Sequence, residues 1–135
     1  MGEVLRAGVI GAGVFGGYHA QKYAALPGVV LAGVYDHHPV HADALAARCG
    51  GQVFASVAEL ITAVDIVSIA TPAIAHAGPA LAALEAGKAV YVEKPLAADP
   101  QDAARIADLA ARNGALASLR GNAAEDDKRF SRVRL

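Results

Sequence analysis

Residues 5–20 read LRAGVIGAGVFGGYHA, and this stretch decides the fold. Its first six residues form an apolar run that is typical of a buried strand. A Gly-x-Gly-x-x-Gly motif follows at once, at Gly11, Gly13 and Gly16, and a helical pattern follows the motif. A strand, this glycine spacing and a helix, in that order, are typical of a fold that binds a dinucleotide, whose pyrophosphate lies on the amides at the helix N-terminus.

Each glycine has an expected task in such a loop. Gly11 can make the tight turn, Gly13 can let the backbone approach a pyrophosphate, and Gly16 can let the helix pack closely on the strand. We expect Val14 and Phe15, which lie between the last two glycines, to contact the same ligand. The alternative is a plain turn of an α/β protein.

The rest of the chain alternates between short apolar strands and helices rich in alanine and leucine. The strands are continuous apolar runs, which is typical of strands that helices cover on both faces. This rhythm predicts an α/β fold, a doubly wound parallel Rossmann sheet of about six strands in the order 3-2-1-4-5-6. The predicted strands cover residues 5–10, 29–35, 52–55, 65–70, 88–92 and 115–119, and the predicted helices cover residues 17–26, 40–49, 56–63, 73–86 and 100–113.

Composition and charge exclude several classes of protein. The 135 residues fit one domain, and no apolar run approaches the roughly 18 residues that span a membrane. A net charge of −1 argues against nonspecific binding of nucleic acid. The single cysteine, Cys49, excludes an internal disulfide, and the first residues show no signal peptide. We therefore expect a cytoplasmic protein without a nucleic-acid or membrane partner.

Asp36 ends the second predicted strand, 20 residues after Gly16. A carboxylate at this place can accept hydrogen bonds from the ribose hydroxyls and repel a 2′-phosphate, which favours NAD over NADP. His37, which we count with the cofactor site, and His38 weaken this preference, because a protonated histidine could tolerate a phosphate. The alternative is that Asp36 only begins a turn. His41 completes a group of three histidines, but no cysteine or carboxylate ligand set accompanies them at a recognised spacing, so we expect no metal.

More polar residues follow the fourth and fifth predicted strands, at the sheet edge where such folds bind their ligands. Thr71 and Pro72 could contact the ribose or phosphate on the nicotinamide side. His76, one turn into the next predicted helix, either faces this crevice or lies on the surface. Glu93 and Lys94 could belong to the site or form a surface ion pair, which would contribute about 0–1 kcal/mol.

Taken together, these motifs resemble the N-terminal domain of the glucose–fructose oxidoreductase / inositol dehydrogenase / rhizopine-catabolism (Gfo/Idh/MocA) oxidoreductase family. The resemblance covers residues 4–119 and rests on GAGVFG (11–16), VYD (34–36), ATPAIAH (70–76) and LEAGKAVYVEKPLA (84–97). It implies NAD or NADP as cofactor and a sugar, an inositol or a related polyol as substrate. It also implies that Lys94 is a catalytic lysine that transfers or orients a proton, that Glu93 is its neighbour beside the cofactor, and that Pro95 fixes the loop.

The chain departs from the family pattern in two respects. Ala73 stands where many members have Asn, and members continue into a second α/β domain that supplies most of the substrate pocket. Here we expect a dinucleotide-binding domain over residues 1–119 and a charged tail over 120–135, either disordered or a short surface helix. A truncated or frame-shifted gene product and a genuine one-domain relative both fit this pattern.

Three functions are therefore open: an oxidoreductase that a partner completes, a non-catalytic NAD-binding module or sensor, and a protein that binds another nucleotide or coenzyme A. Lys94 favours the first and the missing domain favours the second. We expect a homodimer, because the sixth strand would leave an unpaired sheet edge. We also expect weak or no dehydrogenase activity from this chain by itself. The sequence does not identify the substrate.

Overall fold

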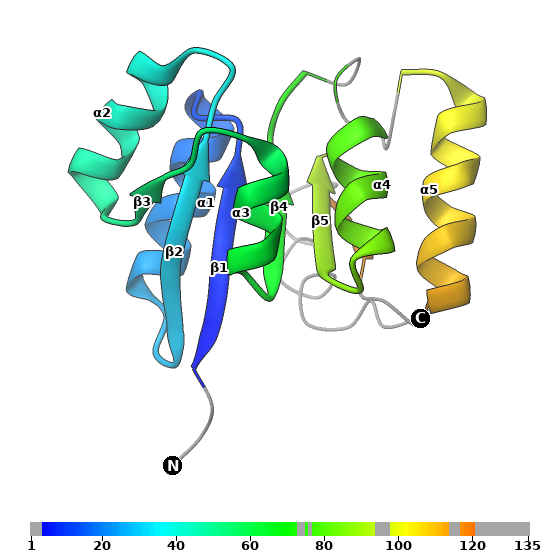
Figure 1. The fold of residues 1–135 in the computed structure, drawn as a ribbon, viewed down its shortest axis with the longest axis horizontal. Helices are drawn as coiled ribbons and strands as arrows, with labels where there is room; N and C mark the ends of the chain where they lie inside the picture. Colours follow the sequence, from blue (N-terminus) through cyan, green and yellow to red (C-terminus); the bar gives the residue numbers. More distant parts are fainter. Residues whose placement is uncertain (1–3, 73–74, 76, 94–97, 114–116, 121–135) are drawn as a thin grey trace.

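The strands form one parallel sheet in the order β3-β2-β1-β4-β5-β6 (Figure 1), which is the predicted order. The computed structural model describes residues 4–72, 75, 77–93, 98–113 and 117–120. The strands are β1 (Leu5–Ile10), β2 (Val29–Tyr35), β3 (Gln52–Val53), β4 (Ile66–Ile69), β5 (Ala89–Glu93) and β6 (Ala117–Arg120). The helices are α1 (Val14–Ala25), α2 (Pro39–Cys49), α3 (Val57–Ala63), α4 (Ala77–Glu85) and α5 (Pro100–Asn113).

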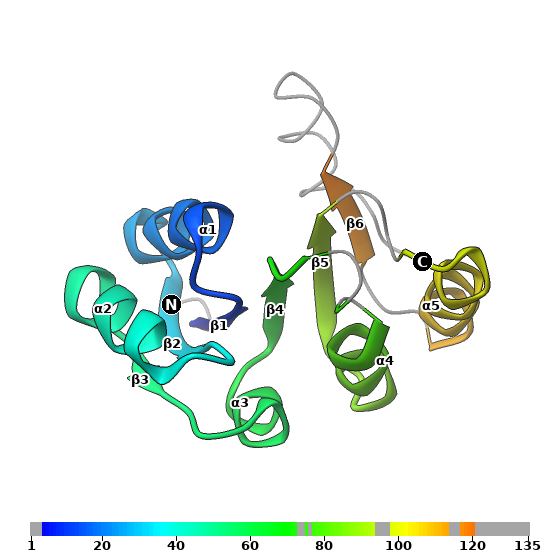
Figure 2. The same cartoon turned by 90° about the horizontal axis from the view of Figure 1, so that it is seen from above.

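Helices cover both faces of the sheet. Figure 2 shows α1 and α2 on one face and α3, α4 and α5 on the other. Each face has its own apolar core, because successive side chains of a strand point to opposite sides. On β1, Val9 packs with α1 and α2 around Ala20 and Leu45, whereas Ile10 packs with the other helices around Leu84. This double burial explains why the strands read as continuous apolar runs.

Two helices begin at the caps that the sequence predicts. The Ser56 side chain accepts a hydrogen bond of 3.1 Å from the amide of Glu59, as a capping box requires. The Asp99 carboxylate accepts one of 2.8 Å from the amide of Gln101, and Pro100 occupies the first position of α5. A proline fits there because the first turn needs no donor from it.

Two predicted helix starts are wrong. The first helix begins at Val14 and not at residue 17, so that Gly16 lies within the helix although glycine is a poor helix former. The fourth begins at Ala77 and not at residue 73. Pro79 accounts for the second error, because a proline is tolerated in the first turn of a helix but not in its interior. A start at residue 73 would have placed Pro79 in the interior.

The strand predictions err only at their ends. β3 is two residues long instead of four, β4 and β5 differ from the predicted bounds by one residue at each end, and β6 ends one residue later than predicted, while residues 115 and 116 of the predicted sixth strand lie outside the described part of the chain. β6 includes Arg120, the first residue of the predicted tail, and residues 121–135 lie outside the described part of the chain. None of the described helices is long and apolar enough to cross a membrane.

Candidate functional site

The turn between β1 and α1 is packed against the end of β4. Gly11 has a φ of +104°, a conformation that side chains rarely adopt. A Cβ on Gly11 would lie 2.7 Å from the carbonyl carbon of Ala70 and 2.8 Å from the nitrogen of Thr71. A Cβ on Gly16 would overlap the carbonyl oxygen of Gly11. These two glycines therefore allow the loop to fold onto the helix and the neighbouring strand.

Gly13 faces open space instead. It is exposed, and a Cβ placed on it would meet no atom within 4 Å. It is the N-cap of α1 and provides no side-chain cap for the helix. Helix N-termini attract anions through their amide donors and the helix dipole. The side chains of Val14 (73% exposed) and Phe15 (49% exposed) flank this opening. The loop therefore fits a pyrophosphate, which could approach the backbone at Gly13 without meeting a side chain.

Asp36 joins the end of β2 to the glycine loop. One carboxylate oxygen accepts a hydrogen bond of 2.7 Å from the amide of Ala12, and the other accepts one of 2.7 Å from the amide of His38. The contact arises because β1 and β2 are parallel neighbours whose carboxyl ends meet at one edge. The sequence predicts Asp36 at this edge, but it does not predict the bond to the loop.

The carboxylate of Asp36 is held in its ionised form. Partial burial raises its pKa, but the hydrogen bonds from Ala12 and His38 and the nearby imidazoles of His41 and His38 lower it, and the resulting pKa lies below the usual range. An aspartate in this state accepts hydrogen bonds and donates none. Each of its oxygens has a second lone pair, which suits a ligand that presents hydroxyl groups.

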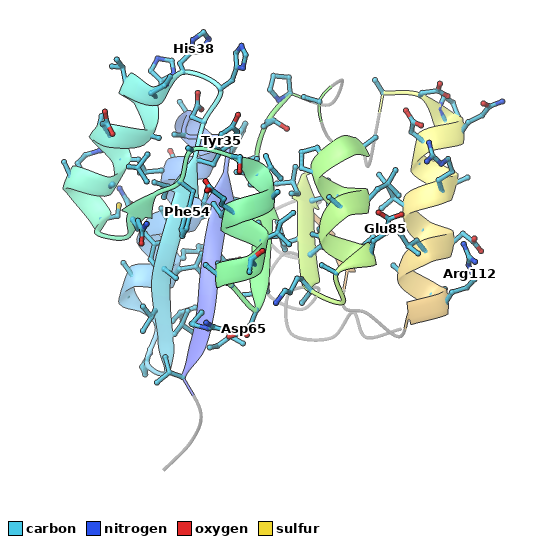
Figure 3. All side chains as sticks on the ribbon, in the orientation of Figure 1. Tyr35, His38, Phe54, Asp65, Glu85 and Arg112 are labelled. Atoms are coloured by element: carbon cyan, nitrogen blue, oxygen red, sulfur yellow. The ribbon has the colours of Figure 1, made fainter. Side chains whose placement is uncertain are left out.

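Three exposed histidines follow this carboxylate in the chain. The ring centroids of His37 and His38 are 5.1 Å apart, and those of His38 and His41 are 5.2 Å apart. Nδ1 of His41 lies 3.6 Å from a carboxylate oxygen of Asp36. Figure 3 shows His38 beyond the carboxyl end of β2, whereas Asp65 lies at the opposite end of the sheet. Among the residues that the structure describes, no group of three or more potential ligands is placed to hold a metal ion.

Thr71 and Pro72 lie beside the glycine turn, at the end of β4. Thr71 is half-buried, and its hydroxyl donates a hydrogen bond of 3.3 Å to the carbonyl of Ala75. Pro72 is exposed, and its carbonyl accepts one of 2.8 Å from the amide of Ala75. The ends of β1, β2 and β4 thus bring together three predicted parts of the site: the glycine loop, Asp36, and Thr71 with Pro72.

The fifth strand reaches the same edge and ends at Glu93, whose backbone pairs with Arg120 of β6. The remaining predicted residues of this edge, Ala73, His76, Lys94 and Pro95, lie outside the described part of the chain.

A buried polar network behind the glycine turn is absent from the sequence-based prediction. The Ser68 hydroxyl on β4 lies 2.6 Å from the Tyr23 hydroxyl and 3.2 Å from Nδ1 of His19, both on α1. The His19 ring also packs on Tyr91 of β5, with 4.9 Å between centroids. Burial raises the pKa of Tyr23 to about 12, so its hydroxyl stays protonated at neutral pH. The spacing of His19 and Tyr23, four residues apart on one helix face, is the signal that could have revealed the network.

Comparisons with known proteins place the chain in a family. The family described as "Oxidoreductase family, NAD-binding Rossmann fold" matches residues 5–120. The chain is 42% identical to UDP-N-acetylglucosamine 3-dehydrogenase of Acidithiobacillus ferrooxidans over 78% of this chain and 33% of that protein. It is 37% identical to inositol 2-dehydrogenase of Cereibacter sphaeroides over 77% of this chain and 32% of that protein.

A solved structure is similar over most of the fold. GenD2 from gentamicin A biosynthesis, solved in complex with NAD, has a TM-score of 0.84 and 35% identity, and the match covers 90% of this chain and 36% of that chain. The present chain thus spans about a third of the length of its relatives, and the matching third is their N-terminal Rossmann domain.

Proposed function

Because the chain belongs to the Gfo/Idh/MocA oxidoreductase family, with its NAD-binding Rossmann fold, we propose that it binds NAD as the cofactor-binding part of a dehydrogenase. The relatives that it matches act on a nucleotide sugar and on inositol by name, which supports a sugar, an inositol or a related polyol as the substrate. Bound NAD would accept a hydride from a CH–OH group of that substrate.

The observation that carries this proposal is the hydrogen bond between Ala12 and Asp36. It holds an ionised carboxylate 2.7 Å from the amide of a loop that opens to solvent at Gly13. In a bound dinucleotide the adenosine ribose and the pyrophosphate are neighbours. The glycine loop and Asp36, which the hydrogen bond joins, can therefore hold both groups. We assign the ribose to Asp36 and His37, and the pyrophosphate to the loop. The loop residues are Gly11, Gly13, Val14, Phe15 and Gly16.

The nicotinamide half would lie along the ends of β4 and β5. Thr71, Pro72, His76 and Glu93 are the residues that we assign to it, and Lys94 is the residue that we assign to proton transfer or substrate orientation. The assignments of His76 and Lys94 rest on the sequence resemblance. The second candidate function is a non-catalytic NAD-binding module, which would need only the glycine loop and Asp36.

Calorimetric titration of the purified chain with NAD, NADP and coenzyme A tests the proposal. We expect NAD to bind and coenzyme A not to bind. Asp36→Ser should reduce the preference for NAD over NADP by about tenfold, because it removes both the ribose acceptor and the repulsion of a 2′-phosphate. Coenzyme A binding in place of NAD would overturn the proposal, and an unchanged NAD-to-NADP ratio in Asp36→Ser would remove Asp36 from the ribose site.

An activity assay separates the two candidate functions. Turnover of inositol or of a nucleotide sugar with NAD, abolished in Lys94→Ala, would establish an enzyme. NAD binding without turnover of either substrate would favour a cofactor-binding module that acts with another domain or partner. We expect the second result for this chain by itself.

Two further features are part of the proposal. We propose that the protein is cytoplasmic, which its single unpaired cysteine, Cys49, supports. We also propose that it forms a homodimer near β6. The position of β6 at the end of the strand order supports this, because unpaired backbone groups at a sheet edge favour association.

A further inference from the structure

Helix α1 has two large buried side chains, and both are polar. Its buried residues are Gly16, Gly17, His19, Ala20 and Tyr23. The two glycines and the alanine are too small to interlock with the sheet, so His19 and Tyr23 are the side chains that can fix where α1 lies on it. Apolar contacts have no preferred direction, whereas hydrogen bonds do. The position of α1 therefore depends on the bonds that these two side chains make.

Both side chains meet one hydroxyl group. The Ser68 hydroxyl on β4 lies 2.6 Å from the Tyr23 hydroxyl and 3.2 Å from Nδ1 of His19, and Ser68 is fully buried. Ser68 comes three residues before Thr71, which we assign to the nicotinamide half of the cofactor. His19 lies about 7.5 Å along the helix axis from Val14, the first residue of α1. The network thus joins the helix that follows the glycine loop to the strand that leads to the nicotinamide side.

We propose that His19, Tyr23 and Ser68 are positioning residues that couple the two halves of the NAD site. All three are buried, and none is among the residues that we assign to the ligand. They hold the glycine loop at a fixed offset from the end of β4, so that the pyrophosphate and the nicotinamide half of one dinucleotide are held together. This inference rests on the proposed function, because it needs NAD to extend from the glycine loop to the end of β4.

The network is the second of two attachments between α1 and β4. The first is at the glycine turn, where Gly11 approaches the backbone so closely that a Cβ on it would lie 2.7 Å from the carbonyl carbon of Ala70. Burying polar groups removes them from water, but a fully bonded network specifies one arrangement of the elements that it joins. Without the second attachment, α1 can pivot about the first. The loop would then lose its alignment with the end of β4.

The adenosine half of the site does not depend on this network. The amide of Ala12 donates a hydrogen bond of 2.7 Å to Asp36, which joins the loop to the end of β2. ADP has the adenosine and the diphosphate of NAD but lacks its second ribose and its nicotinamide, so ADP needs only this part of the site. The ratio of NAD affinity to ADP affinity therefore measures how well the second half of the site is aligned with the first.

Calorimetric titration of the whole chain with NAD and with ADP tests the inference. We expect Ser68→Ala and Tyr23→Phe to lower the ratio of NAD affinity to ADP affinity by about fivefold, while ADP affinity changes by less than about twofold. The control is Ile106→Val, which removes a buried methyl group on α5, across the sheet from α1, and lowers stability without changing the network. It should leave the ratio unchanged. Urea denaturation of each variant establishes that it is folded under the conditions of the titration.

The outcomes separate this inference from the proposed function. A ratio that falls in Ser68→Ala and Tyr23→Phe but not in Ile106→Val supports the coupling, and Tyr23→Phe decides if Ser68→Ala does not fold. A ratio that stays unchanged, or that falls equally in Ile106→Val, rejects the coupling and leaves the NAD-binding function in place. The same holds if the natural chain binds ADP as tightly as NAD. If the natural chain does not bind NAD, both the coupling and the proposed function are rejected.

Discussion

The three glycines of the loop are equivalent in the sequence motif but have different surroundings in the structure. Gly11 and Gly16 touch backbone, whereas Gly13 faces open space. The spacing predicts this division of tasks, because the motif encodes where the chain must turn and where it must pack. It does not predict the bond between Ala12 and Asp36, since that bond depends on how far the loop after β2 folds back toward β1.

Substitutions at two of these glycines should therefore have different effects: loss of NAD binding at Gly13 and loss of stability at Gly16. Gly13→Val should lower the free energy of unfolding by no more than about 1 kcal/mol, because the new side chain enters empty space and only the N-cap preference of glycine over valine is lost, but it should abolish NAD binding. Gly16→Ala should destabilise the fold by about 1–3 kcal/mol, because its Cβ would overlap the Gly11 carbonyl. Urea denaturation and calorimetry measure the two quantities. A folded Gly13→Val protein that binds NAD normally would contradict the loop assignment.

The ion pair of Asp65 with Arg6 makes the free energy of unfolding depend on pH. Hydrogen bonds from the Arg6 guanidinium and the Arg6 amide lower its pKa, more than its slight burial raises it. A carboxylate with a lowered pKa contributes stability above its unfolded pKa, near 4, and loses it as the pH falls through the folded value. Because the ion pair is exposed, we expect at most about 1 kcal/mol.

We expect the contribution of Asp65 to the free energy of unfolding to be constant above about pH 5 and to be lost below about pH 4, so that the fall in acid is less steep in Asp65→Asn. Asp43→Asn, which changes an exposed carboxylate on α2, is the matched control. Denaturant titrations across this pH range make the comparison. Equal slopes for Asp65→Asn and the natural chain would show that Asp65 has no part in the acid response.

At the scale of elements, the buried network fixes α1 against two strands of the sheet. The Tyr23–Ser68 and His19–Ser68 contacts join α1 to β4, and the stacking of His19 on Tyr91 joins α1 to β5. The N-terminus of α1 and the ends of β4 and β5 are the parts from which the candidate site is built. The network therefore holds the glycine loop in register with the ends of β4 and β5.

Tyr23→Phe should destabilise the protein by about 1–2 kcal/mol, because it removes the 2.6 Å hydrogen bond to the fully buried Ser68. Tyr18→Phe is the control on the same helix, since Tyr18 is 52% exposed, and it should change stability by less than about 0.5 kcal/mol. The midpoints of urea denaturation report both effects. Similar midpoints for the two variants would mean that the network adds no stability.

Helix starts show where sequence reasoning succeeds and where it fails at this scale. Capping predicts α3 and α5 correctly, since Ser56 and Asp99 bond to backbone amides two or three residues away. The start of α1 depends instead on a tertiary contact, the packing of Gly16 on Gly11, which outweighs the low helix propensity of glycine. Pro79 is the signal in the sequence for the start of α4, because a proline fits the first turn of a helix.

The order of strands is the whole-molecule feature that the sequence predicts best. Alternating strands and helices, parallel pairing and right-handed crossovers leave few arrangements, and the sheet has the expected one. The polar network could not be predicted in the same way. It pairs residues 45 and 49 positions apart, and no local pattern specifies such a pair.

The end of the sheet at β6 leads to a prediction for the assembly. We expect light scattering to give the mass of a dimer at micromolar concentration, with β6 at or near the contact, because an edge strand has unpaired backbone groups. Dilution toward nanomolar concentration should shift the population to monomer if the contact is reversible. A monomer throughout the micromolar range would reject the interface.

The central position of β1 affects how the chain folds while the ribosome synthesises it. β1 bonds to β2 on one side and to β4 on the other, and the amide of Arg6 bonds to Asp65, 59 residues later. At about 5–20 residues per second, β1 emerges about 3–12 s before its second neighbour. During that interval the future centre of the sheet is an open edge in a nascent chain. Such an edge can pair with other chains, and a pause in translation before β4 would lengthen the time for which it is open.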